Sequence, residues 1–138
     1  MIVRSFDEVK EIPVSQLEYK GESIDVDGVT IRWLTHKAIG DESYLHNFAV
    51  RYFTMAPGSE IPIHGHKYVE AVFILKGDIL FKSGGEEKTV KPYDTIYVPS
   101  FEEHALVNIG DTEAAFICCI DCHGDKANCL PGKKTNKC

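Results

Sequence analysis

Short strand-forming runs recur along almost the whole chain, and they constrain its fold more than any other feature. The runs are rich in Val, Ile, Tyr, Phe and Thr, and Gly, Pro and Asp residues separate them. Only residues 5–9 predict a helical turn, with Ser5 as its cap and Glu8 at the capping-box position. Many short strands with almost no helix are typical of a β-barrel or sandwich, so we predict an all-β fold. The strands are expected at residues 29–34, 47–55, 68–75, 78–82, 87–90, 95–99, 104–109 and 114–120.

Tight turns indicate how neighbouring strands are joined. Asp27-Gly28 has the composition of a turn, and residues 83–85 and 108–111 have the composition of hairpins. Strands joined in this way run antiparallel. We therefore expect antiparallel sheets.

The run at residues 69–75 is apolar on both of its faces. Val72 and Ile74 point one way, and Ala71 and Phe73 point the other way. A strand with one face in water would alternate apolar and polar residues. We expect one face to line the barrel interior and the other to be covered by a second sheet or a second subunit, and we favour a homodimer.

Composition limits the class of protein. The 138 residues, of which 43% are hydrophobic and 26% are charged, fit one globular domain. Fifteen Lys and Arg against 21 Asp and Glu give a net charge of -6, without a cluster of cations to neutralise phosphates, so we expect no nucleic-acid partner. Residues 1–11 contain no continuous apolar run, which predicts neither a secretory signal nor a membrane span. We expect a cytoplasmic protein.

All five cysteines lie in the last 21 positions. We assign residues 1–121 to the barrel and residues 122–138 to a cysteine-containing C-terminal tail. In a reducing compartment, clustered cysteines favour metal ligation or a redox role over permanent disulfides. The tail predicts a second metal site, for zinc or an iron–sulfur cluster, with a redox disulfide or unlinked thiols as the alternatives. Its candidate ligands are Cys119, Cys122, His123, Cys129 and Cys138.

Three histidines and a glutamate form the strongest candidate site. His64 and His66 are two residues apart, so in a strand both imidazoles point to the same side. Glu70 follows four residues later, and His104 begins a later strand that also contains Asn108. Three imidazoles and a carboxylate suit a divalent transition metal and leave one or two coordination positions for substrate or water. The alternative is a set of surface side chains that bind no ion.

The same segments resemble the two motifs of the cupin family. Residues 58–77 match the first motif, G-x5-H-x-H-x3-E-x6-G, at every fixed position, and residues 93–108 resemble the second, G-x5-P-x-G-x2-H-x3-N. Tyr93 and Phe101 replace the two glycines of the second motif, which shape turns. The resemblance implies a double-stranded β-helix, or jelly-roll barrel, with manganese, iron, nickel, copper or zinc on the four ligands. The matching residues are Gly58, His64, His66, Glu70, Gly77, Pro99, His104 and Asn108.

A metal centre with open positions indicates chemistry on a small molecule. We favour an oxidoreductase of the dioxygenase type that uses Fe(II) or Mn(II), while an isomerase or lyase would use the ion as a Lewis acid. A non-catalytic cupin that senses a small molecule or stores a metal is the alternative from another class, because one scaffold hosts many functions. Arg51 and Tyr97 lie in predicted strands and are candidate pocket residues. Otherwise Arg51 would be an edge residue whose stem covers apolar surface, and Tyr97 a core residue.

Overall fold

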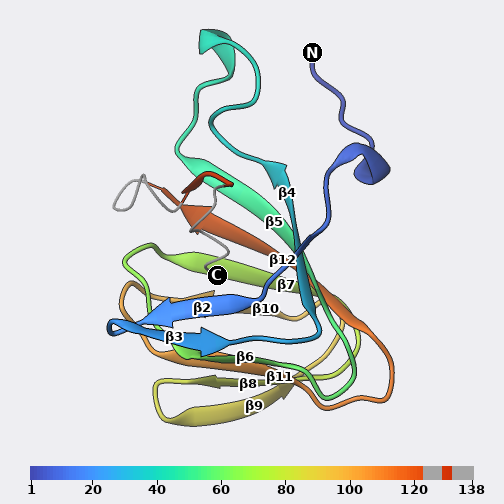
Figure 1. The fold of residues 1–138 in the computed structure, drawn as a ribbon, viewed down its shortest axis with the longest axis vertical. Coiled ribbons are helices and arrows are strands. Elements are labelled where there is room, and N and C mark those ends of the chain that lie inside the picture. Colours follow the sequence, from blue (N-terminus) through green and yellow to red (C-terminus); the bar gives the residue numbers. More distant parts are fainter. Residues whose placement is uncertain (123–128, 132–138) are drawn as a thin grey trace.

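A computed structural model describes residues 1–122 and 129–131 of the chain, and strands dominate it (Figure 1). The all-β prediction is confirmed. In chain order the strands are β1 (Ile12–Pro13), β2 (Gln16–Tyr19), β3 (Glu22–Asp25), β4 (Val29–Thr35), β5 (Phe48–Met55), β6 (Glu60–His64), β7 (Glu70–Lys76), β8 (Ile79–Ser83), β9 (Glu86–Val90), β10 (Thr95–Val98), β11 (His104–Asn108) and β12 (Ala114–Asp121).

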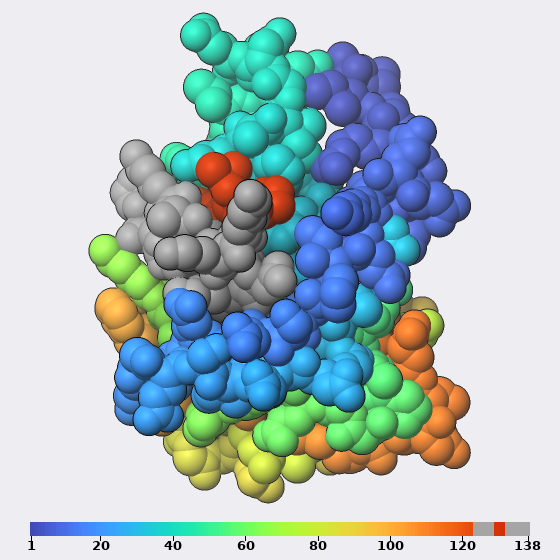
Figure 2. Space-filling view, in the orientation of Figure 1, coloured from blue at the N-terminus to red at the C-terminus, as the bar shows by residue number. Residues whose placement is uncertain are grey.

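Two short 3-10 helices, η1 and η2, accompany the strands within residues 1–122. The predicted N-terminal turn is present as η1 (Phe6–Glu8), where the Glu8 carboxylate accepts a hydrogen bond from the Ser5 N–H at 3.1 Å. The second, η2 (Glu42–Tyr44), lies in the connection from β4 to β5, which projects from the body of the molecule (Figure 1 and Figure 2). Within the described ranges, no helix is long and apolar enough to cross a membrane.

The strands form two main sheets. The larger has the order β1-β4-β5-β12-β7-β10 and the smaller has the order β6-β11-β8-β9, while β2 and β3 form a separate hairpin. Every strand pair in these sheets is antiparallel, as predicted. Because strands distant in the sequence, such as β5 and β12, are neighbours in a sheet, the arrangement is the expected jelly roll.

The hydrophobic core lies between the two sheets. Phe53 and Phe116 of the larger sheet are buried in the same cluster as Ile79 and Leu106 of the smaller sheet. Each Leu, Ile or Phe side chain removed from water in this way contributes about 1.5–3 kcal/mol. We therefore expect the barrel to hold its fold without help from a metal.

All eight expected strands are present, with ends shifted by at most two residues, and the predicted hairpin at residues 83–85 joins β8 to β9. Sequence patterns do not predict β1, β2, β3 and β6. The segment of β6 contains Pro62, and a proline argues against a strand because it lacks the N–H donor. The structure accommodates Pro62 because β6 is an edge strand. Strand β1 has two residues, which is too short to show a periodic pattern.

The predicted hairpin at residues 108–111 is wrong. Strand β11 pairs with β6 and β8, whereas β12 pairs with β5 and β7, so the turn carries the chain from one sheet to the other. Asn108 secures this crossover. Its side-chain nitrogen donates to the carbonyls of Met55 and Thr112 at 2.9 Å, and its oxygen accepts from the Gly110 N–H at 3.0 Å.

Only one face of β7 is buried within the described chain. Val72 and Ile74 point into the core, whereas Phe73 on the opposite face is 37% exposed. In the described residues, therefore, no second sheet covers Phe73. The expectation that a second sheet packs on this face of β7 is wrong. The other, a second subunit, stays a prediction.

Candidate metal centre

Three histidines from different parts of the chain meet at one end of the barrel. His64 ends β6 and His104 begins β11, and the two residues are register partners in the smaller sheet. His66 follows β6 directly. One ring nitrogen of each histidine lies within 4.8 Å of those of the other two. Nitrogens bound to one ion at about 2.1 Å lie up to about 4.2 Å apart, so this spacing is close to that of a metal site.

The backbone orients all three imidazoles in the same way. Nδ1 of His64 lies 2.7 Å from the Pro62 carbonyl oxygen, and Nδ1 of His104 lies 2.9 Å from that of Glu102. Nδ1 of His66 has an equivalent contact at 2.9 Å with the Tyr68 carbonyl. A carbonyl only accepts hydrogen bonds, so each Nδ1 carries a proton, and in the neutral ring Nε2 keeps its lone pair. This is how metal-binding histidines are fixed by their surroundings.

The buried nitrogens test whether a metal fits. His64 is 2% exposed, and its Nε2 has no hydrogen-bond partner among the described residues. A buried polar atom without a partner costs about 1–3 kcal/mol, so such an atom is a sign of a missing ligand. A metal ion at this position would satisfy the lone pair. The donor set therefore fits a divalent transition metal.

Glu70 lies beside the histidine cluster at the start of β7. Its Oε2 is 3.1 Å from Nε2 of His66, and its Oε1 is 3.4 Å from Nε2 of His104. A bend at residues 67–68 separates β6 from β7, so Glu70 arrives from the other sheet rather than along one continuous strand. Its place as a fourth ligand stays a prediction.

Glu70 is 1% exposed, and its surroundings favour the charged carboxylate. Burial alone would raise the pKa of Glu70. The contacts with His104 and His66, together with the charge of Arg51, outweigh burial and hold the pKa well below its ordinary value. An ionised carboxylate next to three imidazoles is a suitable donor set for a divalent cation.

The loop that precedes β11 is hydrogen-bonded to the loop between β6 and β7, which carries His66. The Phe101 N–H donates to the His66 carbonyl at 2.7 Å, and the Ser100 hydroxyl donates to the Lys67 carbonyl. Phe101 has φ of 66°, in the region that favours glycine. The replacement of the motif glycine therefore leaves the backbone conformation of this turn in place.

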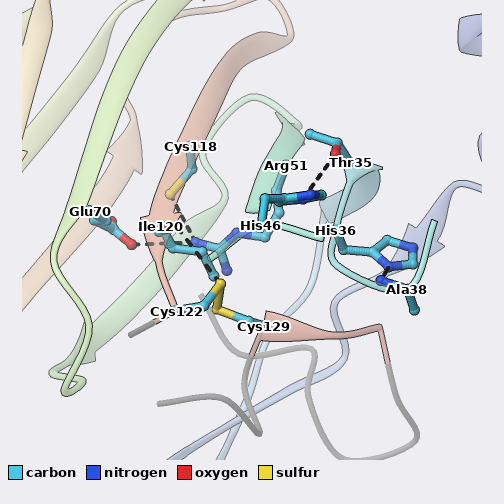
Figure 3. Close-up of a disulfide and its surroundings, with 10 residues drawn as sticks. All are labelled: Thr35, His36, Ala38, His46, Arg51, Glu70, Cys118, Ile120, Cys122 and Cys129. Atoms are coloured by element: carbon cyan, nitrogen blue, oxygen red, sulfur yellow. Dashed lines mark hydrogen bonds and ion pairs between the residues drawn. A yellow bond between two sulfur atoms is a disulfide. The ribbon is translucent and has the colours of Figure 1, made fainter. Parts of the chain in front are cut away.

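The two candidate pocket residues have different locations. Arg51 of β5 is completely buried, and its Nη2 lies 3.5 Å from Oε2 of Glu70 and 2.9 Å from Sγ of Cys118 (Figure 3). Its interpretation as an edge residue is wrong. Tyr97 is 73% exposed, so it is neither a core residue nor part of the histidine cluster. Direct contact of either residue with a substrate stays a prediction.

Sequence patterns did not single out Tyr68, although it supports the site. Its ring stacks on the His66 ring, with centroids 3.8 Å apart and planes at 12°, and the residue is 1% exposed. In the sequence, the signal that could have indicated this role is an aromatic residue two positions after a predicted ligand.

Two of the C-terminal cysteines form a disulfide in the structure. The predicted second metal site is therefore not supported. Cys122 and Cys129 are bonded to each other, and a sulfur in a disulfide is not a thiolate ligand. Cys119 is exposed on β12, whereas Cys118 points inward. The remaining candidates, His123 and Cys138, lie outside the described residues. The domain boundary at residue 121 stays a prediction.

Comparison with known proteins agrees with this architecture. The 1-methylthio-D-xylulose 5-phosphate methylsulfurylase of Rhodospirillum rubrum is 30% identical over 77 residues, which cover 56% of this chain and 49% of that protein. The oxalate-binding protein of Thermotoga maritima is 32% identical over 79 residues, which cover 55% of this chain and 65% of that protein. The chain thus spans about half the length of the first relative and just under two thirds of the second.

The fold has equally clear relatives among solved structures. A polyketide cyclase from Streptomyces resistomycificus superposes with a TM-score of 0.73 at 21% identity, over 91% of this chain and 82% of that one. The cupin domain family matches residues 51–120, a range that contains the three histidines and Glu70. The chain therefore belongs to the cupin domain family.

Proposed function

We propose that the protein is a metal-dependent oxidoreductase of the dioxygenase type that acts on a small organic molecule. The observation that supports this proposal is the convergence of His64, His66 and His104, each with Nδ1 bonded to a backbone carbonyl. These three residues would hold the ion together with Glu70. When bound, Fe(II) or Mn(II) supplies Lewis-acid and one-electron chemistry toward O2 and a substrate.

The chain itself prepares the site in three ways. Backbone carbonyls keep the imidazoles in one tautomer, so no reorientation is needed when a ligand binds. The stacked ring of Tyr68 fixes the plane of His66. Because Glu70 and His104 are almost completely buried, bulk water is excluded and electrostatic interactions inside are stronger than at the surface.

The names of the relatives support a small molecule as the substrate. One relative is named for 1-methylthio-D-xylulose 5-phosphate, and the other for oxalate binding. The absence of a nucleic-acid partner and the cytoplasmic location are expectations from composition alone.

Metal analysis and oxygen uptake test the proposal. Protein purified without added metal and without a His tag should contain about one transition-metal ion per chain. After reconstitution with Fe(II) in the absence of oxygen, O2 uptake should require a substrate, which a screen of thiols, diketones and catechols can identify. His64→Ala should abolish both the bound metal and the activity, while circular dichroism shows an intact fold.

The matched control is His46→Ala, which changes a histidine outside the cluster and should keep full metal content. A wild-type protein that binds no transition metal contradicts the proposal. Metal binding with a product formed without oxygen would favour an isomerase or lyase. Tight binding of a small molecule with neither oxygen uptake nor product would favour the sensor or storage alternative.

A further inference from the structure

Arg51 is a buried cation beside the metal centre, and the proposed chemistry gives it no task. Among the described residues it is the only Lys or Arg that is buried. It lies in the middle of β5, with Trp33 of β4 and Cys118 of β12 as its register partners. Burial of an unpaired guanidinium costs several kcal/mol, so the fold keeps Arg51 only because particular partners stabilise it.

Aromatic rings and a thiol anchor the guanidinium. Its central carbon lies 5.3–5.7 Å from the ring centroids of Trp33, Phe53 and Tyr68, within the range of cation–π attraction. Its Nη2 donates to Sγ of Cys118 at 2.9 Å. Figure 3 shows Cys118 and Glu70 both pointing toward the end of the Arg51 side chain. The guanidinium is thus held in one place rather than free to follow the carboxylate.

The two oxygens of Glu70 have different neighbours. Oε2 accepts a hydrogen bond from Nη2 of Arg51 at 3.5 Å and also lies 3.1 Å from Nε2 of His66. Oε1 is turned toward His104 and has no hydrogen bond from any described residue. The ion pair with Arg51 therefore distinguishes the two oxygens: Nη2 of Arg51 contacts Oε2, whereas Oε1 faces Nε2 of His104, one of the nitrogens that would bind the ion.

We propose that Arg51 is a positioning residue of the metal centre: anchored by Cys118, it holds Oε2 of Glu70 so that Oε1 is the oxygen offered to the ion. This inference rests on the proposed function, because it needs a metal at the three imidazoles. A planar guanidinium donates in fixed directions to both Cys118 and Glu70. The ammonium group of a lysine keeps the charge but not this geometry, so Arg51→Lys separates orientation from charge.

Titration of metal-free protein with Mn(II), followed by the electron paramagnetic resonance of the ion, tests the role. Arg51→Lys should raise the Mn(II) dissociation constant by about tenfold to a hundredfold, the usual effect of losing a residue that orients a ligand. The spectrum of the bound Mn(II) should also change. Cys118→Ala removes the anchor but keeps both charges, so it should weaken binding in the same direction and by less.

Two comparisons separate positioning from a structural role. Met55→Leu changes another inward-facing, buried residue of β5 and should leave the Mn(II) affinity and spectrum as in the wild type. In a Glu70→Gln background, Arg51→Lys should have no further effect on Mn(II) affinity, because Arg51 acts through that carboxylate. Circular dichroism confirms the fold of each variant, and Cys118→Ala carries the test if Arg51→Lys does not fold.

The outcomes are distinguishable from a failure of the proposed function. If the wild type binds Mn(II) no better than His64→Ala and contains no other transition metal, the metal centre itself is refuted, and the role of Arg51 with it. If the wild type binds Mn(II) but Arg51→Lys and Cys118→Ala keep its affinity and spectrum, only the positioning role is refuted. Equal losses in Met55→Leu, or an undiminished effect of Arg51→Lys in the Glu70→Gln background, would also overturn it.

Discussion

Two residues of the second cupin motif hold backbone conformations that normally favour glycine. Tyr93 has φ of 74° and Phe101 has φ of 66°, and both side chains are exposed. A residue with a Cβ atom pays about 1–2 kcal/mol in this region. In this conformation the Phe101 N–H donates a hydrogen bond to the His66 carbonyl, which stabilises the turn. The turn that supports a predicted ligand is therefore maintained at a cost in stability.

Phe101→Gly should stabilise the protein by about 0.5–1 kcal/mol, because the relief of the backbone outweighs the larger unfolded-state entropy of glycine. Urea unfolding measures the change. Leu45→Gly is the control, because Leu45 is equally exposed at 69% but has φ of -60°, so glycine should destabilise there. A Phe101→Gly variant less stable than the wild type would show that the phenylalanine ring contributes more than its backbone costs.

His36 makes stability depend on pH. Burial lowers the pKa of His36, and the charges of Arg4 and His46 act in the same direction. Below the unfolded-state pKa of about 6.5 the unfolded chain therefore binds more protons than the folded one, and the free energy of unfolding falls as the pH falls. Unfolding in urea at about pH 7.5 and about pH 5.5 should show lower stability at the acidic value, and His36→Gln should reduce the difference. A variant with an unchanged pH dependence contradicts this assignment.

Among single residues, sequence patterns predict the three clustered histidines but not the residues that surround them. The spacing of His64 and His66 and the position of His104 at a strand start indicate convergence. The contacts of Arg51 with Glu70 and Cys118 join three strands, β5, β7 and β12, and depend on their register. Register between strands so far apart in the sequence depends on the packing of the whole core, which no local pattern contains.

A disulfide between Cys122 and Cys129 follows strand β12. Both residues are buried, at 2% and 0% exposure, and belong to the same hydrophobic cluster as Ile120. Figure 3 shows the disulfide at the end of the strand that carries Cys118. The disulfide thereby links Cys129 to the core through Cys122.

Reduction of this disulfide should lower the free energy of unfolding. The two cysteines are seven positions apart, and closing a loop of that size stabilises a protein by about 2–3 kcal/mol in the chain-entropy account. Dithiothreitol should add two titratable thiols and lower the urea midpoint, and a Cys122→Ser/Cys129→Ser variant should not respond. Cys119→Ser is the control that keeps the response. Release of thiols by a chelator instead of a reductant would indicate bound zinc and contradict the disulfide.

Strand prediction succeeds where a run has a pattern of its own. Strand β4 alternates apolar buried residues with polar or partly exposed ones along residues 29–33, and the sequence shows this alternation directly. Strand prediction fails for β6 because Pro62 lacks a backbone N–H, which normally argues against a strand. An edge strand such as β6 does not need every N–H for pairing. Prediction also fails for the turn at residues 108–111, where a short polar connection is compatible both with a hairpin and with a crossover between sheets.

The outer face of the larger sheet carries a patch of apolar side chains. Ala71, Phe73, Tyr97, Ile117 and Cys119 share it: Ala71 pairs with Tyr97 and Cys119, and Phe73 pairs with Ile117 in the next row. Tyr97 is 73% exposed and Phe73 is 37% exposed. Patches of exposed apolar side chains on a sheet are typical of interfaces. We propose that a second copy of the chain packs on this face and forms a homodimer.

Phe73→Glu should convert this dimer to a monomer, because each protomer would bury an unpaired carboxylate in the interface. Sedimentation equilibrium should give twice the chain mass of 15.4 kDa for the wild type and the chain mass for the variant. Ile63→Glu is the matched control: Ile63 is 52% exposed on β6 of the smaller sheet, and its replacement should leave the dimer intact.

Cys119 lies on the same face as Phe73, so a maleimide should label Cys119 faster in the Phe73→Glu variant than in the wild type. A wild type that sediments as a monomer at every concentration, or an Ile63→Glu variant that dissociates as readily, contradicts the proposed interface.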